Sequence, residues 1–213
     1  MTVSTASIEG LRFDEQGLIP AVVQDADSGL VLMVAYMSRE SLERTLASGD
    51  VHFWSRSRKT IWRKGETSGN VLRLRSLAAD CDRDCLLVRA EPAGPACHTG
   101  ERSCFFETLA GAAASAELGD ALGRLSRVIR ERHESRPEGS YTAELFSQGA
   151  KGIPRIAQKV GEESTEVVIA AIQGNVVEIA EESADLLYHL LVLWKASGVE
   201  PGAVASALER RMK

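Results

Sequence analysis

The apolar pattern of this chain changes its period once along its length, and this change constrains the fold more than any other feature. Up to residue 110, short runs of Val, Leu and aromatic residues alternate with turn sequences such as Asp27-Ser28-Gly29, which is typical of β-strands. From Leu118 onward, apolar residues recur every three or four positions, the spacing of amphipathic helices. An Ala-rich linker, residues 107–120, lies between the two patterns. We therefore expect two domains, residues 1–112 and residues 113–213.

The first domain is predicted to be α+β with a mixed or antiparallel sheet. Its expected strands are residues 21–24, 30–36, 51–54, 71–74 and 86–88. Ser38 is a candidate N-cap for a helix that ends near Gly49. The second domain is predicted to be an all-α helical bundle. Four helices are expected. The first begins near Leu118, and the others cover residues 154–173, 176–196 and 201–212.

Charge and hydropathy limit the classes of partner. The formal net charge of −5 argues against general binding to nucleic acids or anionic membranes, because both need a basic surface. The longest apolar stretch, residues 186–194, is too short to span a bilayer, and the N-terminus lacks the pattern of a secretory signal. We expect a cytoplasmic protein. In that compartment, four cysteines confined to residues 81–104 favour metal or catalytic thiols over disulfides.

Aspartates and cysteines alternate in the segment Asp80-Cys81-Asp82-Arg83-Asp84-Cys85. If this segment is extended, the three aspartates share one face and the two cysteines the other. Carboxylate oxygens suit Mg²⁺ and thiolates suit Zn²⁺, so one strand would serve two metals. The alternative for the aspartates is a solvated acidic turn.

Two more thiols follow in Cys97-His98-Thr99-Gly100-Glu101-Arg102-Ser103-Cys104. Zinc would be held by three ligands, Cys81, Cys97 and Cys104, which leaves its fourth position for an activated water. His98 would be placed to move a proton. Two alternatives are a closed structural site that also uses Cys85, and cysteines that are simply buried.

A basic segment between Trp54 and Trp62 offers charged groups and hydroxyls for phosphate, and rings for stacking. A small phosphorylated ligand fits it better than a nucleic acid, given the acidic net charge, although a solvated basic strand would have the same composition. The expected substrate contacts in and after this segment are Trp54, Ser55, Arg56, Ser57, Arg58, Lys64, Glu66, Thr67, Ser68 and Asn70.

The motifs Asp-Cys-Asp-Arg-Asp, Gly-Pro-Ala-Cys-His-Thr-Gly-Glu-Arg-Ser-Cys-Phe and Lys-Gly-Glu-Thr-Ser-Gly-Asn give residues 11–110 a close resemblance to phosphoribosyl-AMP cyclohydrolases of histidine biosynthesis. The resemblance implies that zinc-activated water opens the adenine ring at the N1–C6 bond. It also implies a dimer that shares each zinc between subunits, and His98 as the base. The implied ligands are Cys81, Cys97 and Cys104 for zinc and Asp80, Asp82 and Asp84 for magnesium. Cys85 stands where members of the family usually have a small or apolar residue.

The second domain carries two pairs of acidic residues at helical spacing. Glu163 and Glu166 share a face of one expected helix, and Glu182 and Asp185 share a face of the next. The short turn between these helices would make them antiparallel and bring both pairs together, and four clustered carboxylates need a cation such as Mg²⁺. The alternative is a solvated Glu-rich face.

Residues 118–213 resemble phosphoribosyl-ATP pyrophosphatases, which are all-helical nucleotide pyrophosphohydrolases, through Ser140-Tyr141-Thr142, Lys159-Val160-Gly161-Glu162-Glu163 and the segment 181–189. The resemblance implies Glu163, Glu166, Glu182 and Asp185 as magnesium ligands, the first two also as catalytic residues, with Glu162 as a possible further ligand. It further implies a homo-oligomer. Lys159 and Lys151 are candidates for phosphate contact.

The two resemblances concern consecutive reactions, since the product of the second domain is the substrate of the first. The expected protein is thus a bifunctional hydrolase that converts phosphoribosyl-ATP to phosphoribosyl-AMP and pyrophosphate, and then opens the purine ring. The alternative is a house-cleaning nucleoside triphosphate pyrophosphohydrolase fused to a zinc-binding dimerisation module.

Overall fold

The computed structural model describes residues 8–111, 117–147 and 152–212. The chain forms two compact units, Met1–Gly123 and Arg124–Lys213, which are described separately below. Within the described ranges, no helix combines the length and the apolar character needed to cross a membrane.

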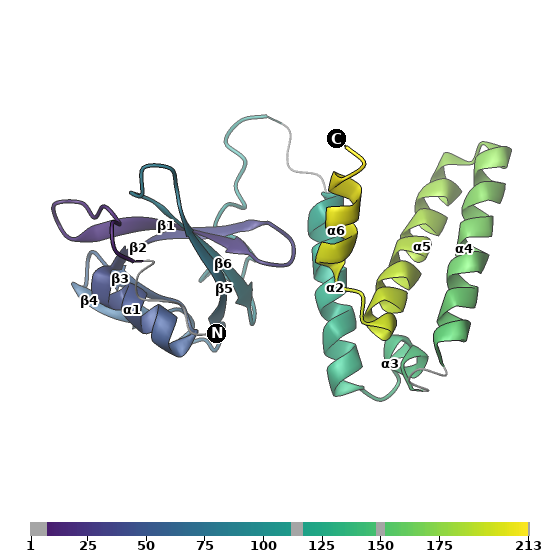
Figure 1. The fold of residues 1–213 in the computed structure, drawn as a ribbon, viewed down its shortest axis with the longest axis horizontal. Coiled ribbons are helices and arrows are strands. Elements are labelled where there is room, and N and C mark those ends of the chain that lie inside the picture. Colours follow the sequence, from purple (N-terminus) through teal and green to yellow (C-terminus); the bar gives the residue numbers. More distant parts are fainter. Residues whose placement is uncertain (1–7, 112–116, 148–151, 213) are drawn as a thin grey trace. The chain divides into compact units, whose positions relative to one another are not determined.

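The first unit is built on a six-stranded sheet with the strand order β4-β3-β2-β1-β6-β5 (Figure 1). The strands are β1 (Leu18–Asp25), β2 (Val31–Ser38), β3 (His52–Ser55), β4 (Thr60–Arg63), β5 (Leu72–Ala79) and β6 (Leu86–Pro92). Strands β1 and β6 are parallel and the other pairs are antiparallel, so the α+β domain is confirmed and, of the two predicted alternatives, its sheet is mixed.

The central strands of the sheet carry the core of this unit. Burial alternates along β1, where Ile19, Ala21 and Val23 are fully enclosed. Val88 and Ala90 on the neighbouring β6 are enclosed as well. Because successive side chains of a strand point to opposite faces, this alternation gives the sheet one fully buried face.

Helix α1 (Arg39–Ser48) follows β2 directly, as the sequence predicts. The Ser38 hydroxyl accepts a hydrogen bond from the Ser41 backbone N–H, and the Ser41 hydroxyl accepts one from the Ser38 backbone N–H. This pair of bonds satisfies two backbone donors at the helix start. The buried hydroxyl of Thr45 accepts from the His52 backbone N–H over 2.8 Å, so the helix is tied to the start of β3.

The second unit is all helical, as predicted. Its helices are α2 (Leu118–Ser135), which begins before the unit boundary, α3 (Tyr141–Leu145), α4 (Ile153–Gln173), α5 (Val176–Ser197) and α6 (Pro201–Glu209). Helices α4 and α5 form a hairpin and lie side by side (Figure 1). Gly174 ends α4 with a positive φ of 69°, and the Asn175 side chain caps α5 by accepting from Glu178 N–H, so the reversal needs only two residues.

Three predictions of local structure need correction. Residues 80–85 are a turn between β5 and β6, not an extended strand, because the backbone N–H groups of Asp84 and Cys85 donate hydrogen bonds to the Asp80 carboxylate. The last helix ends at Glu209, short of the predicted residue 212. Helix α3 and strand β4 were absent from the predicted elements, since each has five residues or fewer and too few apolar positions to set a period.

Candidate active sites

The turn between β5 and β6 gathers the three aspartates of the first unit. Asp80 Oδ1 accepts from the backbone N–H groups of Asp84 and Cys85, each over 3.0 Å. Through this turn, Asp80, Asp82 and Asp84 bring one carboxylate oxygen each to within 4.8 Å of the others. The predicted metal ligands are thus brought together, although by a turn and not by one face of a strand.

Arg83, in the middle of this turn, holds it against the N-terminal segment. Arg83 has a positive φ of 65°, a conformation in which few residues with a side chain are found. Its guanidinium donates to the carbonyl oxygens of Gly10 and Glu9 over 3.0 and 3.1 Å, and its own carbonyl accepts from Arg12 N–H over 2.8 Å. The acidic turn is therefore fixed by residues that lie some seventy positions earlier.

The electrostatics of the three aspartates favour a bound cation. The negative charge of Asp82, more than any other cause, raises the pKa of Asp84 above its usual value. The backbone N–H of Cys85 instead lowers the pKa of Asp80, which stays ionised. Three exposed carboxylates that repel one another, with one fixed by backbone donors, match the hard oxygen donor set that Mg²⁺ prefers.

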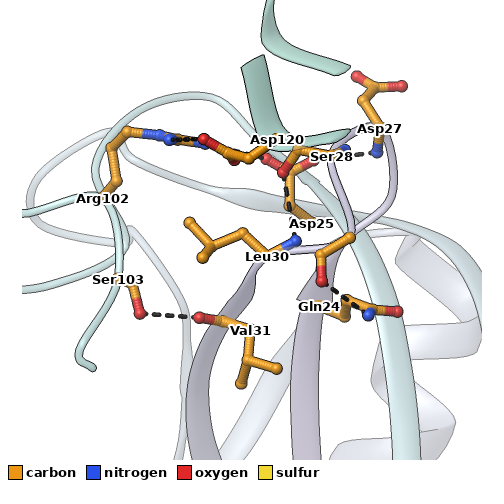
Figure 2. A network of polar contacts seen from close by, with 10 residues as sticks. Gln24, Asp25, Asp27, Ser28, Leu30, Val31, Arg102, Ser103 and Asp120 are labelled. Carbon is orange, nitrogen blue, oxygen red and sulfur yellow. Dashed lines mark hydrogen bonds and ion pairs between the residues drawn. The ribbon is translucent and has the colours of Figure 1, made fainter. Parts of the chain in front are cut away.

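The loop after β6 places Cys97 and Cys104 near each other. The buried Cys97 thiol accepts a hydrogen bond from the Thr99 hydroxyl over 3.1 Å, which lowers the pKa of Cys97, and the Cys104 thiol lowers it further. Cys104 N–H donates to the Leu32 carbonyl over 2.7 Å. Beside it, the Ser103 hydroxyl donates to the Val31 carbonyl over 2.7 Å, as Figure 2 shows. Strand β2 therefore positions one end of the cysteine loop. Burial raises the pKa of the Cys104 thiol at this end.

The third proposed zinc ligand lies on a different loop. Cys81 is exposed on the acidic turn, with its sulfur 4.0 Å from Asp82 Oδ1. Among the described residues of one chain, Cys81, Cys97 and Cys104 do not form a group with ligand atoms within 4.8 Å of one another. Cys85 is half-buried directly before β6, and burial raises the pKa of its thiol, which does not favour the thiolate form that binds metal. His98 is exposed, with Nδ1 3.8 Å from Cys97 Sγ.

The predicted phosphate segment forms the β3–β4 hairpin. Ser55 Oγ accepts from the backbone N–H and from Nε of Arg58, over 3.2 and 3.3 Å, and the Arg56 guanidinium lies 4.0 Å from the centre of the Tyr36 ring. Trp54 is half-buried, whereas Arg56, Ser57 and Arg58 are exposed. These basic groups are therefore available to an anionic ligand at the hairpin.

The loop after β4 links the other predicted substrate contacts to the cysteine loop. Lys64 is buried, and its charge lowers the pKa of Cys104. The Asn70 side chain covers Gly94, where an added Cβ would lie 2.4 Å from Asn70 Oδ1. Between them, Glu66, Thr67 and Ser68 are exposed. Lys64 thus lies near the Cys104 thiol and Asn70 lies against Gly94, three residues before Cys97, and local spacing reveals neither proximity.

In the helical unit, α4 and α5 bring their carboxylates together as predicted. Glu163, Glu166 and Glu182 each place one carboxylate oxygen within 4.8 Å of the others. Glu163 is only 8% exposed, and its pKa is raised, first by burial and then by the charge of Glu166. Asp185 also raises the pKa of Glu163 and of Glu182, so the fourth predicted ligand lies close to the group.

Two basic side chains flank Glu163. Lys159 Nζ lies 2.7 Å from Glu162 Oε2 and 3.9 Å from Glu163 Oε1, and the bond with Glu162 raises the pKa of Lys159 while lowering that of Glu162. His189 Nε2 lies 3.6 Å from Glu163 Oε1, and burial lowers the pKa of this histidine. Lys151, the other candidate for phosphate contact, lies outside the described residues.

The short helix α3 borders this site. The buried Thr142 hydroxyl forms a 2.8 Å hydrogen bond with the Tyr188 hydroxyl on α5, and it accepts from Arg132 on α2. The adjacent Tyr141 ring lies edge-on to His189, with ring centres 6.3 Å apart. No role for Tyr141 follows from local spacing, although Ser140 before it is an N-cap residue that predicts a helix start.

Comparisons with known proteins agree with this arrangement. The family model described as phosphoribosyl-AMP cyclohydrolase matches residues 33–106, and the one described as phosphoribosyl-ATP pyrophosphohydrolase matches residues 122–212. The chain is 49% identical over 201 residues to the histidine biosynthesis bifunctional protein HisIE of Bacillus subtilis, a match that covers 94% of each chain. It is 50% identical over 213 residues to HisIE of Xanthomonas campestris, covering all of this chain and 98% of the relative. HisIE of Thermus thermophilus is 45% identical over 204 residues, covering 96% of this chain and 93% of the relative.

This chain belongs to the HisIE family. It is a bifunctional enzyme of histidine biosynthesis, in which a cyclohydrolase domain precedes a pyrophosphohydrolase domain. The match over nearly the whole length does not favour a house-cleaning pyrophosphohydrolase fused to a zinc module. The cyclohydrolase match includes the acidic turn and the cysteine loop, and the pyrophosphohydrolase match includes all four acidic residues of α4 and α5.

The side chains of this HisIE chain fit the use of metal ions that the cyclohydrolase family implies. The Cys97 thiol has a lowered pKa and lies near a second thiol, which suits a soft metal. In each of the two clusters of acidic side chains, three carboxylate oxygens lie within 4.8 Å of one another. Like charges do not favour this spacing without a cation.

Proposed function

We propose that the first unit opens the adenine ring of phosphoribosyl-AMP at N1–C6, and that the helical unit hydrolyses phosphoribosyl-ATP to phosphoribosyl-AMP and pyrophosphate. The observation that carries this proposal is the presence of two unlike donor sets, thiols with aspartates in one unit and glutamates on two helices in the other. The order of the reactions follows from their chemistry, because ring opening consumes the product of pyrophosphate release.

In the first unit, Cys81, Cys97 and Cys104 would hold zinc. Zinc, when bound, supplies the activation of the water that adds to C6 of the purine. The Thr99 hydroxyl stabilises the thiolate form of Cys97, which is the form that binds metal. His98, exposed beside Cys97, accepts the proton of the attacking water and returns a proton to N1 as the C6–N1 bond breaks.

The zinc site is completed by a second copy of the chain in this proposal. Cys81 lies on the acidic turn, apart from the other two thiols of its own chain, so a Cys81 from another copy would supply the third ligand. Exposed apolar side chains support self-association in both units. They are Val34, Leu87, Phe105 and Phe106 in the first unit and Val168, Ile169, Ile172, Val176 and Val177 near the turn between α4 and α5. We propose a homodimer or a higher homo-oligomer.

The substrate's phosphate in the first unit would contact the β3–β4 hairpin. The exposed guanidinium groups of Arg56 and Arg58 offer paired donors for phosphate oxygens. Asp80, Asp82 and Asp84 would hold Mg²⁺ on the acidic turn. The other proposed substrate contacts are Trp54, Ser55, Ser57, Lys64, Glu66, Thr67, Ser68 and Asn70.

In the helical unit, Glu163, Glu166, Glu182 and Asp185 would hold Mg²⁺. Magnesium, when bound, supplies charge neutralisation for the triphosphate and orients the attacking water. Glu163 and Glu166 are the proposed catalytic carboxylates, and the ammonium of Lys159, 3.9 Å from Glu163, contacts a phosphate oxygen. The proposed location is the cytoplasm, and the proposed partners are small nucleotides, not nucleic acids or membranes.

The test is an assay of the purified chain with Zn²⁺ and Mg²⁺. We expect pyrophosphate release from phosphoribosyl-ATP, followed by the absorbance change of purine ring opening. Omission of Mg²⁺ should stop the first reaction, and removal of zinc by a chelator should stop only the second. A chain that releases no pyrophosphate from phosphoribosyl-ATP would overturn the proposal.

A further inference from the structure

The side chains along one end of the α4–α5 hairpin follow a fixed order. Glu166 and Glu182 lie in the carboxylate group together with Glu163. Lys159, one helical turn before Glu163, and His189 on α5 come next, at 3.9 and 3.6 Å from Glu163 Oε1. Tyr141 of α3 follows, with its ring 6.3 Å from the His189 ring, centre to centre. The series is thus carboxylates, then a cation and an imidazole, then an exposed phenol ring.

Tyr141 is not a packing residue of the bundle. Its buried neighbour Thr142 attaches α3 to the bundle through hydrogen bonds of its hydroxyl with Tyr188 and Arg132, whereas Tyr141 is 46% exposed. Among the described residues of the helical unit, it is the one aromatic residue with a large exposed apolar surface. Tyr188 and His189 are at least half-covered, and the Tyr141 ring lies against both of them. One side of the Tyr141 ring is therefore supported, while solvent reaches the remainder.

This order matches the order of groups in a nucleoside triphosphate. The β- and γ-phosphates require the cation held by the carboxylates, the next phosphate requires a positive side chain, and the purine beyond the ribose requires an apolar face. At the opposite end of the hairpin the exposed apolar residues are aliphatic, among them Ile172 and Val176. An aromatic face for the base is thus offered at the Tyr141 end.

We propose that Tyr141 is the base-stacking residue of the pyrophosphohydrolase site. It binds the purine of phosphoribosyl-ATP while the triphosphate extends toward Lys159 and the carboxylates. This inference rests on the proposed function of the helical unit and adds to it the direction in which the substrate lies along the hairpin.

The experiment measures how two competitive inhibitors slow pyrophosphate release by the full chain. AMP carries the base, whereas inorganic tripolyphosphate has none. For Tyr141→Leu, we expect the inhibition constant of AMP to rise about tenfold, the loss that removal of one base–aromatic stack brings, with the constant of tripolyphosphate unchanged. The KM for phosphoribosyl-ATP should rise by a similar factor, with kcat within about twofold. Tyr141→Phe keeps the ring and should retain the wild-type constants.

The controls separate this inference from folding and from the proposed function. Ring opening of phosphoribosyl-AMP by the same preparations reports an intact first unit, and Tyr141→Asn replaces the leucine variant if that variant is insoluble. The inference is overturned if Tyr141→Leu binds AMP as tightly as the wild type, or if AMP and tripolyphosphate weaken equally. If the wild-type chain itself releases no pyrophosphate, the proposed function fails, which is a different result.

Discussion

The Thr99 hydroxyl donates a hydrogen bond to Cys97 Sγ across 3.1 Å, and this bond is the largest cause of the lowered pKa of Cys97. Hydrogen bonds to charged groups contribute roughly 1.5–3 kcal/mol, so Thr99→Val should weaken zinc binding by about tenfold or more. Competition with a chromophoric zinc chelator measures the change. Thr99→Ser keeps the hydroxyl and should retain the wild-type affinity. Equal zinc affinity in the valine variant and the wild type would show that the hydroxyl does not support the metal site.

The buried carboxyl of Glu163 predicts a pH dependence of stability. Its folded-state pKa is raised above 4.5, so its stabilising contribution is full below that pH and is lost as the pH rises through the folded value. In metal-free protein, Glu163→Gln should therefore have a higher Tm than the wild type near neutral pH, and this difference should shrink as the pH falls toward 4.5. Added Mg²⁺ should raise the Tm of the wild type most at neutral pH.

Thermal unfolding followed by circular dichroism, with and without Mg²⁺, measures this effect. Glu181→Gln is the matched control, because Glu181 is exposed on α5 next to Glu182. It should leave both the pH dependence and the Mg²⁺ effect unchanged. A Glu163→Gln variant that gains as much from Mg²⁺ as the wild type would argue against a metal at this site.

The contacts of Arg83 with the carbonyls of Gly10 and Glu9 predict a role for the N-terminal segment in magnesium binding. Each of these two hydrogen bonds contributes about 1 kcal/mol, so Arg83→Ala should raise the Mg²⁺ concentration for half-maximal ring opening by up to about thirtyfold. Pyrophosphate release, which is assigned to the helical unit, should not change. Arg75→Ala, which removes an exposed ion pair with Glu91, is the control. An unaltered Mg²⁺ requirement in Arg83→Ala would mean that the acidic turn keeps its shape without this anchor.

The backbone of Gly65 predicts a large cost for a small substitution. Gly65 has a φ of 84°, and an added Cβ would lie 2.4 Å from the backbone of Asn70 and Val71. Gly65→Ala should lower the free energy of unfolding by roughly 2–4 kcal/mol, since strain and overpacking add. Gly69→Ala, at a φ of 77° with open space around it, should cost only about 1–2 kcal/mol. Urea unfolding of both variants gives the comparison, and equal costs would mean that the Asn70 backbone moves aside freely.

The elements of the fold were largely predictable because most of them have a clear apolar period. Alternation along β1 and three-to-four spacing along α4 and α5 set these elements locally. The acidic turn was not predictable in this way, since alternating aspartates suit a strand unless Asp80 accepts from the backbone beyond it. Helix α3 has five residues and is fixed by a bond between Thr142 and Tyr188, which are far apart in the sequence.

The two candidate sites also contain parts that local spacing predicts and parts that depend on contacts between residues far apart in the sequence. The glutamates of α4 and α5 were predicted to converge because a helical period and a short connection determine the faces of a hairpin. The closeness of Asn70 to Gly94, and of Lys64 to Cys104, depends on how loops cross the sheet, which no local spacing encodes. Sequence therefore predicted which carboxylates of α4 and α5 come together better than it predicted what surrounds the thiols.

The central claim is that two separate metal-dependent sites in one chain perform consecutive hydrolyses. A two-substrate assay of Glu163→Gln and Cys97→Ser tests it most directly, with phosphoribosyl-ATP and phosphoribosyl-AMP supplied separately to each purified variant. We predict that Glu163→Gln loses pyrophosphate release and keeps ring opening, whereas Cys97→Ser loses ring opening and keeps pyrophosphate release. Loss of both reactions in a variant that remains folded, or of neither, would contradict the account.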